Sequence, residues 1–115
     1  MKRIIALEEL AIFAACIAAF TTMDFAWWWF PALLLVPDVA MAGYLFGPKV
    51  GAVSYNMVHH RAVALAVGAA GVAIASPALQ LVGIIGMAHI SMDRMLGYGL
   101  KTMEGFEYTH LGRLN

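Results

Sequence analysis

Side chains with the nitrogen and oxygen ligands that divalent metals prefer recur at helical spacing. His89 and Asp93 are four residues apart, so in a helix they project from one face. His59 and Asp38 lie in separate apolar segments, and Asp38 follows Pro37, whose ring opens a helix locally. Imidazole and carboxylate groups from several helices of a bundle suit zinc, iron or manganese. The sequence therefore predicts a divalent metal held by Asp38, His59, His89 and Asp93.

Other polar residues could serve a reaction at this site. Glu8 and His110 are candidates for a general base acting on a bound water. Arg94 is a candidate for steadying an anionic group such as a lipid phosphate. Tyr55 and Asn56 precede the histidine ligand of their segment by four and three residues, so we expect them to help hold the bound group. Hydrolysis is the expected reaction, with a redox role for iron as an alternative.

Two interpretations without a metal stay open. The same residues could form a metal-free proton relay or ligand pocket, or purely structural ion pairs such as Asp93 with Arg94 or Arg61. His60 adjoins His59 but points about 100° away around a helix, so both cannot serve one inward site.

The elements that must position these residues are apolar helices. The chain has 115 residues, 63% hydrophobic and 12% charged, with a mean hydropathy of +0.80. A soluble domain is about 45–50% apolar and about 25% charged. A bilayer core requires about 20 apolar residues per helix, and four segments qualify: residues 5–22, 25–46, 50–75 and 78–96. With a polar tail over 97–115, we expect an all-α fold, a single-domain integral membrane four-helix bundle with short loops.

Basic residues near the helix ends predict the orientation of this bundle. All of them fall at the two termini or between the second and third segments: Lys2, Arg3, Lys49, Lys101 and Arg113. Four helices place these regions on one side, so both termini should be cytoplasmic and the polar residues should lie in the cytoplasmic half. The zero formal net charge argues against a nucleic-acid partner. Membrane lipid is the expected partner, with a homo-oligomer or a larger membrane complex as further candidates.

Several motifs follow one another in order over nearly the whole chain: Leu7-Glu8, Pro37-Asp38-x-x-Met41-x-Gly43-Tyr44, Tyr55-Asn56-x-x-His59, Ala88-His89-Ile90-x-x-Asp93-Arg94-x-x-Gly97-Tyr98-Gly99-Leu100-Lys101 and Thr109-His110-Leu111-Gly112-Arg113. Together they resemble domain-of-unknown-function family 4260, small bacterial membrane proteins. The resemblance implies a bacterial four-helix protein of the inner membrane and favours His59 over His60. It singles out Glu8, Asp38, Asn56, His59, His89, Asp93, Arg94 and His110. It implies no activity.

Two functions of different class follow from these residues. The first is a metal-dependent membrane enzyme, hydrolase-like, with its site open to the cytoplasm. The alternative is a non-enzymatic protein, either a small oligomeric transporter or an accessory subunit of a larger membrane complex. For the tail we expect a sharp turn at Gly97 and Gly99 that brings His110 over the mouth of the site.

Overall fold

In a computed structural model the chain is almost entirely helical. The structure describes residues 2–99, 108–109 and 111–113. Its helices, in order, are α1 (Lys2–Thr21), α2 (Trp29–Leu34), the 3₁₀ helix η1 (Val36–Phe46), α3 (Pro48–Val58), α4 (Arg61–Ala73) and α5 (Pro77–Met95). Two short strands, β1 (Tyr108–Thr109) and β2 (Gly112–Arg113), pair antiparallel in the tail. The predicted all-α class is confirmed.

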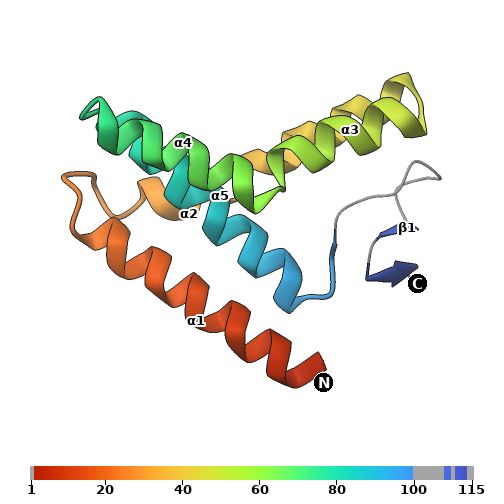
Figure 1. The fold of residues 1–115 in the computed structure, drawn as a ribbon, viewed down its shortest axis with the longest axis horizontal. Helices are drawn as coiled ribbons and strands as arrows, with labels where there is room; N and C mark the ends of the chain where they lie inside the picture. Colours follow the sequence, from red (N-terminus) through yellow and green to blue (C-terminus); the bar gives the residue numbers. More distant parts are fainter. Residues whose placement is uncertain (1, 100–107, 110, 114–115) are drawn as a thin grey trace.

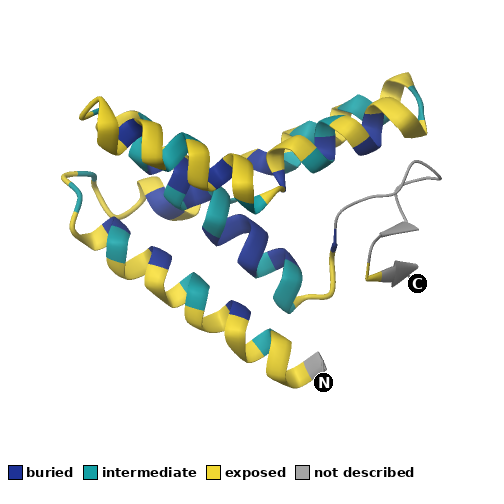
Figure 2. Ribbon diagram, viewed as in Figure 1, coloured by how far each residue is buried: buried dark blue, intermediate teal, exposed yellow. Residues whose placement is uncertain are grey.

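Helix α5 is the element around which the other helices are arranged. It packs against α1 and α4, and α2 also contacts it. Figure 1 shows α1 running along one side while the hairpin of η1 and α3 extends away from α1. Figure 2 shows that α5 is the most continuously buried helix, whereas α1, α3 and α4 are largely exposed. The buried apolar side chains that pack together in this core are Cys16, Phe20, Phe30, Leu81, Ile85 and Ala88.

The segment predicted as one helix over 25–46 is instead divided into α2 and η1. Pro37 explains the break, because its nitrogen carries no hydrogen and its ring obstructs a continuous α-helix. The N–H of Asp38 donates to the carbonyl of Leu35 over 3.1 Å, not to that of Leu34. The other backbone donor that could reach Leu34, in a 3₁₀ turn, would be residue 37, which is the proline. The break therefore leaves the Leu34 carbonyl available to a side chain.

The segment predicted over 50–75 is likewise divided, into α3 and α4, at His59 and His60. The backbone of His60 is extended, with φ −96° and ψ 126°, and its Nδ1 accepts the N–H of Ala62 over 3.1 Å as the cap of α4. The N–H of Val63 donates to the His60 carbonyl, also over 3.1 Å. Both backbone donors that could reach the His59 carbonyl are thus engaged at His60.

The hairpin of η1 and α3 sets the position of Asp38 relative to the end of α3. Gly47 forms its turn with φ 113°, a backbone conformation that favours glycine. Ser54 in α3 donates its hydroxyl to the carbonyl of Ala40 in η1 over 3.0 Å. These contacts hold the first residues of η1 beside the last residues of α3.

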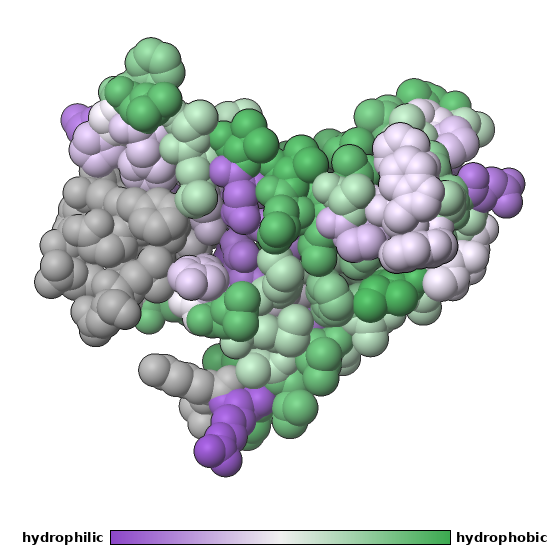
Figure 3. Space-filling model, turned by 180° about the vertical axis from the view of Figure 1, so that it is seen from behind, coloured by the Kyte–Doolittle hydropathy of each residue, from purple (hydrophilic) through white to green (hydrophobic). Residues whose placement is uncertain are grey.

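Much of the described surface is apolar. Leu45 is 85% exposed and Phe46 79%, and Figure 3 shows a mostly hydrophobic face with hydrophilic atoms in a narrow central hollow and on a few projecting side chains. Two segments, Arg3–Thr21 and Trp29–Phe46, are long and apolar enough to cross a membrane, while Arg61–Ala73 is apolar but shorter. An apolar surface of this extent is typical of a lipid or protein contact and not of exposure to water.

Candidate metal centre

The four residues predicted to bind a metal come together in the structure. Asp38 extends from η1, His59 from the end of α3, and His89 and Asp93 from α5. One ligand atom from each lies within 4.8 Å of every other. The side chains of both histidines and of Asp93 are buried, whereas that of Asp38 is 36% exposed. We call these four residues the His/Asp cluster, and its open side is at Asp38.

The spacing of the ligand atoms suits a small divalent ion. The two Nε2 atoms are 2.9 Å apart, and each lies near Oδ1 of Asp38, at 3.4 Å from His59 and 3.1 Å from His89. Oδ2 of Asp93 lies 3.5 Å from Nε2 of His59 and 3.4 Å from that of His89. Tetrahedral ligands at about 2.0–2.1 Å from an ion are about 3.3–3.4 Å from one another. The observed separations lie around this value.

Backbone carbonyls fix which imidazole nitrogens carry hydrogen. Nδ1 of His89 donates to the Leu34 carbonyl over 2.6 Å, and Nδ1 of His59 donates to the Tyr55 carbonyl over 2.9 Å. A carbonyl oxygen only accepts, so each neutral ring presents a lone pair at Nε2. Such carbonyl partners are typical of metal-binding histidines. Two nitrogen lone pairs and two carboxylate oxygens therefore converge, an arrangement that a shared cation stabilises.

The two helix breaks supply carbonyls to side chains of α5. The Leu34 carbonyl, left by the break at Pro37, accepts from His89. The His59 carbonyl, left by the break at His60, accepts from Nη2 of Arg94 over a long 3.4 Å. Each break thus has a partner among the site residues.

Tyr55 and Asn56, the two residues expected to help hold the bound group, lie in different surroundings. The Tyr55 hydroxyl donates to Oδ2 of Asp93 over 3.1 Å. Its ring stacks on that of His59, with centroids 3.8 Å apart and planes 4° from parallel. Asn56 lines a separate cavity that also includes His60. Tyr55 belongs to the site, and the role expected for Asn56 stays a prediction.

The residues expected to take part in catalysis are also separated. Arg94 lies beside the cluster, where its Nη1 donates to the Tyr98 carbonyl over 2.9 Å. Glu8 is exposed on α1 and is not brought to the cluster, because the buried face of that helix passes through Glu9. His110, and with it the expected capping of the site by the tail, lies outside the described residues.

The sequence prediction missed an ion pair between Glu9 and Arg61, which joins α1 to the start of α4. The side chain of Glu9 is 10% exposed and that of Arg61 30%. Helical periodicity is the signal that could have identified Glu9. It lies seven and eleven residues before Cys16 and Phe20, both buried on the same face of α1. Glu8 is one position off that face.

A polar cavity of about 260 Å³ opens at the exposed side of the cluster, and we call it the polar cavity. Its lining residues are Asp38, Met41, Tyr55, Asp93 and Tyr98. Tyr98 reaches it because α5 ends in a glycine-terminated turn: its N–H returns to the Asp93 carbonyl over 2.8 Å, and Gly97 between them has φ 90°. The end of α5 therefore shapes the mouth of the site.

We expect Gly97→Ala to destabilise the protein by about 1–2 kcal/mol, because a Cβ is disfavoured at positive φ. Unfolding by SDS in mixed micelles measures this loss. Gly68→Ala is the matched control, since a Cβ there meets only the Cα of Gly83 at an ordinary 3.7 Å. An equal loss in both variants would contradict the role of the turn.

A model of the family described as "Domain of unknown function (DUF4260)" matches residues 2–114. The chain belongs to the DUF4260 family. This confirms the resemblance drawn from the sequence motifs. No curated protein and no solved structure matches the chain. The geometry of the His/Asp cluster is what bears on the function of this DUF4260 protein.

Proposed function

We propose that this DUF4260 protein is a metal-dependent membrane enzyme of hydrolase type. The observation that carries the proposal is the convergence of four lone-pair atoms within 4.8 Å from three elements. Both histidines already donate Nδ1–H to backbone carbonyls, so the Nε2 atoms are pre-oriented for an ion. Asp38, His59, His89 and Asp93 would hold zinc, iron or manganese.

The residues around the cluster suit a reaction at its open side. A divalent ion held there would make a bound water more acidic and polarise an ester or phosphoryl oxygen. Tyr55 orients Asp93 through its hydroxyl. Asp38 and Asp93 both line the polar cavity, and Asp38 is the more exposed of the two to incoming water and substrate. Arg94, bonded to the cavity residue Tyr98, is placed to attract an anionic group.

The proposed setting is a bacterial inner membrane, crossed by four apolar segments with both termini in the cytoplasm. The two long apolar segments and the exposed apolar surface support a membrane location. The basic residues at the termini and at Lys49 support this orientation. Broken helices are a feature of substrate and ion sites in membrane transporters. In this setting the cluster would open toward the cytoplasm.

One arrangement also suits the alternative function, a non-enzymatic transporter or accessory subunit. A proton shared between the two Nε2 atoms, 2.9 Å apart, would satisfy the converging acceptors without a metal. The measurement that separates the two functions is therefore the metal content.

We expect the purified protein to contain about one divalent ion per chain by elemental analysis. His59→Asn should weaken binding by about 100-fold or more, since removing even an outer partner of a ligand costs 10–100-fold. His60→Asn is the matched control: the same substitution one residue away, with asparagine able to keep the cap on Ala62. A wild-type protein that takes up no zinc, iron or manganese, even on reconstitution, would overturn the enzyme proposal.

A further inference from the structure

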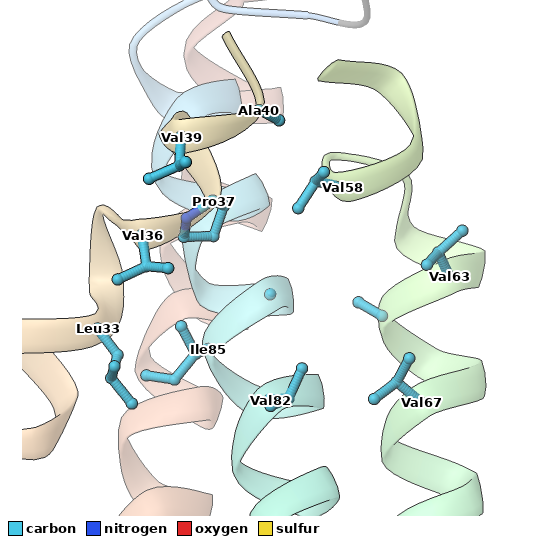
Figure 4. Close-up of a pocket in the computed structure, with 12 residues that line it drawn as sticks. Leu33, Val36, Pro37, Val39, Ala40, Val58, Val63, Val67, Val82 and Ile85 are labelled. Carbon is cyan, nitrogen blue, oxygen red and sulfur yellow. The ribbon is translucent and has the colours of Figure 1, made fainter. Parts of the chain in front are cut away.

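A further cavity, of about 420 Å³, lies beside the cluster and is lined only by apolar residues. Figure 4 shows Pro37 on η1 and Val63 and Val67 on α4 on opposite sides of it, with Val82 of α5 between them. We call it the apolar cavity. Its volume falls within the range of about 300–1,000 Å³ found for small-molecule sites.

Several residues that line the apolar cavity are sequence neighbours of the groups that form the His/Asp cluster. Leu33, Pro37 and Val58 line the cavity, and each is the direct neighbour of a group at the cluster: the Leu34 carbonyl, Asp38 and His59. On α5, Ile85 lines the cavity and comes four residues before His89 of the cluster. The two residues therefore lie on the same face of the helix, about 6 Å apart along its axis.

Along α5 and the turn that follows it, the groups are first apolar, then those of the His/Asp cluster, then polar. Val82 and Ile85 line the apolar cavity, His89 and Asp93 belong to the cluster, and Tyr98 lines the polar cavity. An amphiphile lying along this helix would have its chain, the junction of chain and head group, and its head group beside these three regions in turn. In the orientation proposed above, the chain would point toward the bilayer centre, as in a lipid of the cytoplasmic leaflet.

The rim of the apolar cavity is open to the surroundings of the helices. Val39 is 70% exposed, Val82 55% and Val63 42%. In a bilayer these side chains meet acyl chains and not water. A chain could therefore enter sideways between η1 and α4 without crossing an aqueous phase.

We propose that the substrate of this site is a membrane phospholipid, with one acyl chain in the apolar cavity and its ester or phosphate group at the His/Asp cluster. This inference rests on the proposed function, because it names the substrate class of that same site. The apolar lining provides no charge or hydrogen-bonding side chain, so the cavity would select a chain by its shape. The polar cavity, with Asp38 and Arg94 near it, would receive the head group.

The test uses the full chain in nanodiscs that contain phosphatidylethanolamine with a mid-chain diazirine. After illumination, mass spectrometry locates the labelled residues. We expect label concentrated on the cavity lining of η1, α4 and α5. Val67→Trp fills the cavity and should lower this label by about tenfold or more. Val50→Trp is the matched control, because Val50 is exposed on α3 and outside the lining.

Metal content measured on the same samples separates the two proposals. If the label is spread equally over exposed residues of α1 such as Leu7, and Val67→Trp does not change it, the phospholipid inference is wrong. If the same samples still contain the ion, the proposed metal site is unaffected by that result. Copies cross-linked through Val63→Cys, with the cavity unlabelled, would show a second chain there and also overturn the phospholipid inference. A labelled cavity without any metal would overturn the enzyme and leave lipid binding. If Val67→Trp loses both metal and fold, Val67→Phe provides the same comparison with a smaller ring.

Discussion

Asparagine in place of Asp93 is expected to change stability in opposite directions with and without a divalent ion. In the ion-free protein, Oδ2 of Asp93 faces two acceptor nitrogens, those of His59 and His89. An asparagine amide nitrogen in place of Oδ2 would donate a hydrogen to these acceptors, and the Tyr55 hydroxyl, which now donates to the same Oδ2, could accept the second hydrogen of the amide. Each such replacement of a repulsive contact by a hydrogen bond contributes about 0.5–1.5 kcal/mol. With chelator present, Asp93→Asn should therefore be as stable as the wild type or more so.

With zinc present, the order should reverse. An ion at about 100 times its dissociation constant stabilises the folded state by about 2.7 kcal/mol. For a chain of this size, that raises the melting temperature by about 10 °C. Asp93→Asn removes one anionic ligand, so we expect little or no rise in this variant. Thermal unfolding in detergent, with and without zinc, measures all four values.

Asp24→Asn is the control for this comparison, since Asp24 is exposed in the loop after α1. It should behave as the wild type in both conditions. A loss of stability in Asp93→Asn under chelator would mean that the ionised carboxylate stabilises the ion-free cluster. The converging acceptors would then share a proton, and the metal-free alternative would be favoured.

The cluster could be predicted from sequence because ionisable groups within apolar segments are costly. A histidine and an aspartate four residues apart in α5 need polar partners inside a bundle, and few other polar residues were available. The structure brings the same four residues together: Asp38, His59, His89 and Asp93. Composition and spacing were enough to identify the four residues that converge, and their binding of an ion stays a prediction.

Of the two helix breaks, the one at Pro37 was predicted as a local opening, whereas the one after α3 was not predicted. Pro37 gave a local signal for a disturbance, but not that the freed Leu34 carbonyl would bind His89. The break after α3 has no proline or glycine at its residues. There, tertiary contacts outweigh the local preference for a continuous helix: His59 turns into the cluster while Arg61, two residues later, reaches Glu9 on α1. Only the packing of distant elements specifies that bend.

The choice of Glu8 over Glu9 shows a different limit. The family resemblance emphasised Glu8, whereas the helical period of the buried positions in α1 favours Glu9. Glu8 belongs to the family motif, yet its exposed position on α1 shows no reason for that. Burial on a helix is set by the period of about 3.6 residues, and this period assigns the buried acid to Glu9.

The ion pair of Glu9 with Arg61 leads to the second large effect, which is expected for Arg61→Met. Removing the guanidinium leaves the carboxylate of Glu9 buried and unpaired, a change that costs about 3–5 kcal/mol. Within the described part of the chain, Oε2 of Glu9 has no hydrogen-bond partner even in the wild type. Protein groups therefore satisfy the Glu9 carboxylate only in part, and the ion pair that stabilises this buried charge is the one with Arg61.

The double variant Glu9→Met with Arg61→Met should recover most of this loss, because apolar replacement of a whole buried pair is often neutral or stabilising. Unfolding by SDS in mixed micelles across the two single variants and the double variant gives the coupling energy. Lys49→Met, an exposed change outside any described ion pair, should stay within about 0.5 kcal/mol of the wild type. A double variant as unstable as Arg61→Met alone would show that Arg61 stabilises the fold through another contact. Recovery, in contrast, would locate its effect in the link between α1 and the start of α4, beside the bend that turns His59 into the cluster.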